Sequence, residues 1–88
     1  MMTVEAIQKY KQRQVVLNFY EDEALANREG FPFDYIVVTE SSVQFFRGDQ
    51  CRYAIDREVY PAFHVLPDFK NYFSLTNDQS RIEIYFPE

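Results

Sequence analysis

The motif Phe31-Pro32-Phe33 divides the chain into two parts with different hydrophobic patterns. Proline cannot continue a helix and favours an extended conformation in the residue before it, so a helix that precedes this motif must end there. After the motif, apolar and polar residues alternate with the period of two that is typical of β-strands. The pattern therefore predicts a helical N-terminal third followed by a sheet.

We expect the helical segment over about residues 4–29, with a break near 17–20. Thr3 is a suitable N-cap, and Gly30 stands where a helix C-terminus favours glycine. Residues 14–20 are also compatible with a strand whose alternate apolar side chains share one face. The sequence leaves helix and strand open for this stretch.

Beyond the proline motif, five alternating segments are separated by turn-rich residues, which predicts antiparallel hairpins. These strands are expected at 35–39, 43–47, 51–55, 72–76 and 81–86. Residues 56–70 contain two prolines and are expected to form a packed loop, the alternative being a short edge strand at 62–66. The predicted fold is α+β, a single domain over residues 1–88 with the helical segment packed on an antiparallel sheet of about five strands.

The charge of the chain is uneven. The net charge is −5, with three basic and one acidic side chain in residues 1–20 and six basic and thirteen acidic ones in residues 21–88. An acidic body repels phosphate backbones, so duplex nucleic acid is not expected as a partner. The longest unbroken apolar run is Tyr35 to Val38, which predicts neither a signal peptide nor a membrane span and favours a cytoplasmic location.

Few residues offer catalytic chemistry. The chain has two glycines, which is too few for a phosphate-binding loop, and a single cysteine, which excludes an intramolecular disulfide. His64 is the sole histidine, and its spacing to Asp68 or Cys51 supports neither a base with its orienting carboxylate nor a Cys-His nucleophile. Cys51 is expected to be a buried free thiol. We therefore expect no enzyme, no cofactor and no metal site.

The strand residues that would face away from the helical layer are unusually aromatic. Aromatic residues and arginine are enriched where proteins bind one another. The outer face of the predicted sheet would present such residues together, and the partner-binding residues expected there are Phe46, Arg52, Tyr72, Arg81 and Tyr85. The alternative is that residues 56–70 fold over this face and make it a second small core.

These observations predict a small non-enzymatic protein-interaction module, expected to be a homodimer, that binds a protein partner or itself and no membrane. One alternative is a small-molecule or lipid-binding domain with an aromatic pocket beside Phe63 and Leu66. Another is an acidic inhibitor that mimics nucleic acid, whose charges would be Glu21 to Glu23, Asp34, Glu40 and Asp49.

Overall fold

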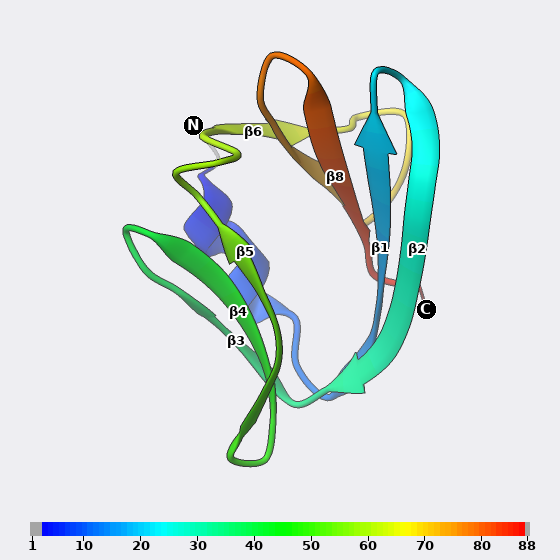
Figure 1. Cartoon of the computed structure of the whole chain (residues 1–88). Coiled ribbons are helices and arrows are strands. Elements are labelled where there is room, and N and C mark those ends of the chain that lie inside the picture. Colours follow the sequence, from blue (N-terminus) through cyan, green and yellow to red (C-terminus); the bar gives the residue numbers. More distant parts are fainter. Residues whose placement is uncertain (1–2, 88) are drawn as a thin grey trace.

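The computed structural model describes residues 3–87, which fold into two antiparallel sheets and one short helix (Figure 1). Sheet A has the strand order β2-β1-β8-β7-β6, and sheet B has the order β3-β4-β5. The elements are the 3-10 helix η1 (Val4–Lys9) and the strands β1 (Arg13–Glu21), β2 (Ala24–Phe33), β3 (Tyr35–Val38), β4 (Ser42–Arg47), β5 (Gln50–Asp56), β6 (Ala62–Val65), β7 (Tyr72–Thr76) and β8 (Ser80–Tyr85).

The predicted α+β fold is wrong, because the helical segment expected over residues 4–29 is helical only in η1. Residues 13–33 instead form the β1-β2 hairpin. Val15 and Leu17 are both fully buried. They are two residues apart, and in a strand this spacing places both side chains on the same face. Asp22 and Glu23, which lie within the expected helical segment, instead make the hairpin turn, where their φ values are 50° and 68°.

The strands expected after the proline motif are confirmed, with boundaries that shift by about one residue. They do not form one sheet, however, because the first three make sheet B and the last two belong to sheet A. The packed loop preferred for residues 56–70 is also wrong. Ala62–Val65 is the edge strand β6, which pairs with β7 between Pro61 and Pro67.

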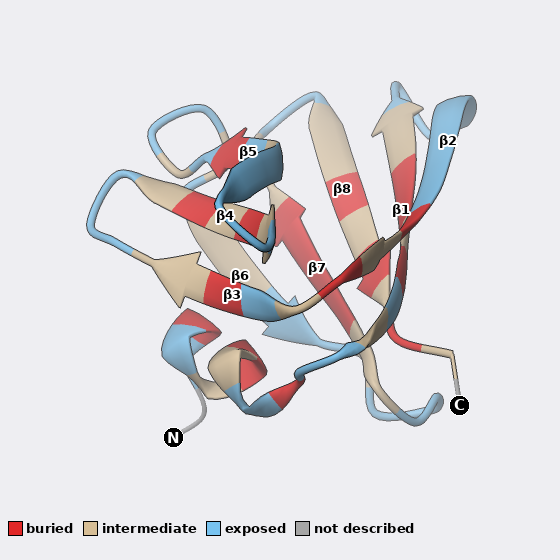
Figure 2. Ribbon diagram, turned by 90° about the horizontal axis from the view of Figure 1, so that it is seen from below, coloured by how far each residue is buried: buried red, intermediate tan, exposed pale blue. Residues whose placement is uncertain are grey.

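The hydrophobic core lies between the two sheets. The chain leaves sheet A at the end of β2 and enters sheet B almost at once at β3, as Figure 1 shows. Aromatic rings connect the layers: Phe33 of β2 contacts both Phe45 of β4 and Phe86, which follows β8. Val4 and Ile7 of η1 are buried in the same core, and Figure 2 shows buried stretches in strands of both sheets while much of β2 is exposed.

Candidate functional site: the outer face of sheet A

The face of sheet A that is turned away from sheet B carries three cross-strand rows of side chains. The strands alternate, so the residues of β1, β7 and β8 that alternate with the core side chains point to this face, although Asn18 and Ser74 among them are themselves buried. We call it the outer face. In strand order β2-β1-β8-β7-β6, its rows are Gly30, Val16, Tyr85 and Tyr72; then Arg28, Asn18, Glu83, Ser74 and His64; then Leu25, Tyr20, Arg81, Thr76 and Ala62.

A hydrogen-bond network links the polar residues of four strands on this face. Arg28 Nε donates to Asn18 Oδ1 at 2.7 Å, and Asn18 Nδ2 donates to the Tyr72 hydroxyl at 3.5 Å. That hydroxyl donates to Glu83 Oε1 at 2.7 Å, while Arg81 Nε donates to Glu83 Oε2 at 3.0 Å. Asn18 is only 5% exposed, so the network holds it in place with both ends of its amide satisfied.

The Tyr72 phenol is the group in this network with the clearest electrostatic perturbation. Burial, and then the hydrogen bond to the Glu83 carboxylate, raise the pKa of Tyr72 to about 12. Both effects favour the neutral phenol, because a phenolate beside Glu83 would place two negative charges together. The Tyr72 hydroxyl therefore keeps its proton to a more alkaline pH than an ordinary tyrosine and donates a hydrogen bond to Glu83 Oε1, while Glu83 Oε2 accepts from Arg81.

Aromatic rings flank the polar network on both sides. The Arg81 guanidinium lies 4.0 Å from the ring centroid of Tyr20, in cation-π contact. On the other side, Phe69, Tyr72 and Tyr85 form a row with ring centroids 5.4 and 5.3 Å apart. The arginine is thus fixed by both a ring and a carboxylate, and its terminal nitrogens lie at the edge of an aromatic surface.

The structure brings together three of the five predicted partner-binding residues. Tyr72, Arg81 and Tyr85 share the outer face. Phe46 and Arg52 lie in sheet B: the Phe46 ring stacks on Tyr35 at 5.2 Å, and the Arg52 guanidinium lies 5.8 Å from the Phe31 ring of β2. Alternation along a strand specifies its two faces and does not specify which sheet it joins.

Residues that sequence reasoning missed complete the site. Tyr20, Asn18 and Arg28 lie in the stretch that was expected to be helical, so they were not assigned to any sheet. The signal that points to Asn18 and Tyr20 is the strand alternative for residues 14–20, which places both of them on one face with Val16. Most of residues 56–70 do not fold over the site, because β6 extends the sheet and Phe63 stacks on the core residue Phe73, whereas Phe69 of this segment contacts the Tyr72 ring at the border of the face.

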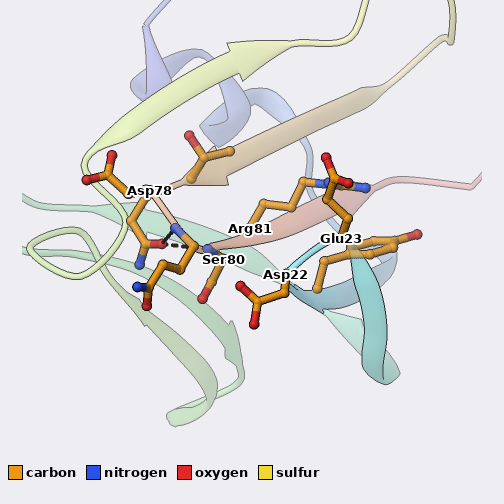
Figure 3. A pocket seen from close by; sticks show the side chains of 9 residues that line it. Asp22, Glu23, Asp78, Ser80 and Arg81 are labelled. Carbon is orange, nitrogen blue, oxygen red and sulfur yellow. Dashed lines mark hydrogen bonds between the residues drawn. The ribbon is translucent and has the colours of Figure 1, made fainter.

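A shallow hollow of about 470 Å³ lies at one end of sheet A, where two hairpin turns meet (Figure 3). Asp22 N donates to Gln79 O at 2.9 Å and joins the β1-β2 turn to the β7-β8 turn. The hollow is lined by Tyr20, Asp22, Glu23, Thr76, Asn77, Asp78, Gln79, Ser80 and Arg81. Within residues 3–87, no group of three or more His, Cys, Asp or Glu side chains is arranged to hold a metal ion.

The two residues considered for catalysis lie apart in the fold. His64 is on the outer face, where its Nε2 lies 3.2 Å from Thr76 Oγ1. Cys51 is in β5 of sheet B and is exposed, so the expectation of a buried thiol is wrong. The pairing of β4 with β5 shifts register between Cys51 and Tyr53, and this irregularity breaks the alternation on which the expectation depends.

Comparisons with protein-family models, with curated proteins and with solved structures gave no match to this chain. Among the described residues, no helix is both long enough and apolar enough to cross a membrane.

Proposed function

We propose that this protein is a non-enzymatic interaction module that binds a partner protein through the outer face of sheet A. The observation that carries the proposal is the arginine of this face: Arg81 is held by the Tyr20 ring and by Glu83, beside a row of tyrosines. Arginine and tyrosine are the residue types that most often dominate binding energy at interfaces. Side chains that are already held in place lose little conformational entropy on binding.

The charge of the face favours a particular kind of partner surface. The rows of the outer face carry two arginines, Arg28 and Arg81, and one carboxylate, Glu83, so their net charge is +1, whereas the net charge of the chain is −5. The Glu83 carboxylate is already bonded to Arg81 and Tyr72, so an incoming carboxylate would meet the arginines. The partner surface that fits is an apolar one with a carboxylate near its centre.

The size of the face bears on the predicted homodimer. Five strands spaced by about 4.8 Å, and three rows spaced by about 7 Å, cover roughly 450 Å². A stable interface buries about 800 Å² on each partner. A second copy that used the outer face alone would therefore bind weakly, and sedimentation equilibrium measures this directly.

The proposal is tested by crosslinking followed by binding measurements. A photoreactive amino acid at the position of Val16 reports contacts on the outer face, and the same group at Gln44 in β4 is the control on sheet B. We expect one protein from the source cells to crosslink at Val16 and not at Gln44. The affinity of that protein should fall about tenfold or more for Arg81→Ala, which is the range of an interface hot spot.

A matched variant separates this face from sheet B. Phe46→Ala removes an aromatic ring that stacks on Tyr35, and it should leave the affinity of the same partner within about twofold of the wild-type value. Crosslinks that come only from the Gln44 position, or an affinity that Phe46→Ala lowers more than Arg81→Ala, would refute the proposed face.

The two alternative functions stay predictions that no particular contact favours. Phe63, beside the expected aromatic pocket, packs on Phe73 of the core. The carboxylates of the expected nucleic-acid mimic are dispersed, and Asp34 is bonded to the Gly48 backbone N–H at 2.7 Å in another part of the molecule.

A further inference from the structure

The two sheets have four edge strands, and β2 is the longest of them. The edge of β3 is covered, because Gln8 Oε1 of η1 accepts the outward N–H of Val38 at 2.9 Å. β6 is four residues long and lies between two prolines, and β5 is interrupted by a register shift. β2 also has a register shift, at Ala26, but its residues 27–33 pair with β1 without interruption. Residues 24–30 are all exposed, and no strand within residues 3–87 pairs with the outer side of β2.

The direction of the β2 backbone groups follows from hydrogen bonds elsewhere in sheet A. Asp22 N donates to Gln79 O at 2.9 Å, and Asn77 N donates to Ser80 O at 2.9 Å. In an antiparallel ladder the bonded pairs recur every second residue, so both contacts place Asn18 and Glu83 in a bonded pair. The neighbour of Asn18 in β1, Leu17, therefore directs its backbone N–H and C=O groups toward β2.

The same alternation fixes which residues of β2 point outward. Leu17 pairs with Glu29, so Glu29 bonds inward to β1. Arg28 and Gly30 therefore direct their N–H and C=O groups away from the sheet, into solvent. Pro32 lies two residues after Gly30, so its backbone also points outward. An edge strand tolerates proline at such a position because the N–H that proline lacks would have faced solvent. The free edge thus presents two donors and three acceptors in strand geometry.

The charges on β2 disfavour a second copy as the occupant of this edge. If two copies joined their β2 strands about a two-fold axis perpendicular to the sheet, each residue would lie opposite a residue of the other copy that points to the same face. Pairing centred on Arg28 or on Glu29 sets like charges directly opposite each other, which is destabilising. Pairing centred on Asn27 would include Ala26, where the register of β2 shifts. Pairing centred on Gly30 would require residues 31–33, which are buried or half-buried.

We infer that the free edge of β2 is a docking site for an extended segment of a different protein, which adds to sheet A as an antiparallel sixth strand. Backbone hydrogen bonds from Arg28 and Gly30 supply the affinity in this mode of recognition. Arg28 faces the outer side of the sheet and Glu29 the other side. The segment that fits carries an acidic residue opposite Arg28 and, next to it, a basic residue opposite Glu29.

This inference shares Arg28 with the outer face, but it rests on the outward backbone groups of Arg28 and Gly30 and has its own matched pair of variants. A Cβ at Gly30 would have its nearest neighbours at 4.0 Å, so Gly30→Ala fits and keeps the outward N–H. Gly30→Pro adds a similar side chain but removes that N–H, and its ring blocks the edge. Neither substitution breaks a bond to β1, so both variants should fold, which circular dichroism checks.

The probe is a displayed library of random linear peptides selected on the wild-type protein. We expect selected peptides to bind Gly30→Ala within about twofold of wild type and Gly30→Pro about tenfold more weakly, because one hydrogen bond is lost and a ring is inserted. They should bind Arg81→Ala as wild type does, which separates this edge from the proposed partner face. Selection of no peptide, or equal binding to Gly30→Pro, would overturn the inference.

Amide hydrogen exchange on the wild-type protein tests the same edge without a variant. In the free protein, the amides of Asn27 and Glu29 should be protected while those of Arg28 and Gly30 exchange fast, and a selected peptide should protect the latter two. Protection of Arg28 and Gly30 that rises with protein concentration alone would assign the edge to a second copy and refute a different partner.

Discussion

The hydroxyl of Tyr72 connects polar side chains of two other strands, since it accepts from Asn18 of β1 and donates to Glu83 of β8. Tyr72→Phe removes both bonds and leaves the buried Asn18 amide and the half-buried Glu83 carboxylate with fewer partners. We expect the free energy of unfolding to fall by about 1 to 2 kcal/mol. Urea denaturation measures the change.

Tyr85→Phe is the control, because the Tyr85 hydroxyl has no hydrogen-bond partner within residues 3–87, and it should change stability by less than about 0.5 kcal/mol.

The raised pKa of Tyr72 predicts a dependence of stability on alkaline pH. Its pKa is about 12 in the folded protein and 10.0 without perturbation. The folded state therefore binds the phenolic proton more tightly, so this contribution to stability is fully present below pH 10 and is lost as the pH rises from 10 to 12. Unfolding measured across this window should show a smaller decline for Tyr72→Phe than for wild type. An equal decline in both proteins would contradict the assignment.

At the scale of single elements, the β1-β2 hairpin contains a strained turn. Asp22 and Glu23 both have positive φ, a conformation that costs residues other than glycine about 1 to 2 kcal/mol. Glu23→Gly should raise the free energy of unfolding by about 1 kcal/mol, as measured in urea.

Gly48→Ala is the complementary test in the β4-β5 turn. The φ of Gly48 is 58° and no atom beyond its chain neighbours lies within 4 Å of an added Cβ, so the expected fall of about 1 kcal/mol in the free energy of unfolding would come from backbone conformation alone. A destabilised Glu23→Gly variant would contradict this account.

The same hairpin shows why part of the fold could not be predicted from sequence. From Tyr35 onward, alternation predicts the strands because their inner residues are buried and their outer residues are polar or half-buried. The exposed half of β2 contains Ala24, Leu25 and Glu29, which are good helix formers on a fully exposed edge. Local propensity therefore favoured a helix there, and pairing with β1 overrode it.

The candidate site was predictable to the same extent. The sequence predicts Tyr72, Arg81 and Tyr85 on one face because each lies on a strand with clear alternation. Arg52 was misplaced because sheet membership depends on the turn from β2 into β3, where one residue separates two strands of different sheets. No periodicity within a strand encodes that change of layer.

At the scale of the whole molecule, sheet A is assembled from both ends of the chain. β1 and β2 precede sheet B in sequence, β6 to β8 follow it, and β1 pairs directly with β8. The outer face joins Asn18 to Glu83 through this pairing, so it exists only when sheet A is complete. Long-range strand pairing of this kind folds slowly, in milliseconds to seconds.

The two sheets should unfold together because one set of rings holds them. Phe33 of sheet A is 1% exposed and contacts Phe45 of sheet B and Phe86, which follows β8. Phe33→Ala should cost about 3 to 5 kcal/mol, a large part of the stability of a domain this size. Phe46→Ala also removes a phenyl ring, but from the half-buried face of sheet B, where it stacks on Tyr35, and should cost about 1 kcal/mol.

Urea unfolding followed by near-UV and far-UV circular dichroism should give one coincident transition for wild type. Separate transitions, or equal losses for both variants, would show that the sheets are stabilised independently.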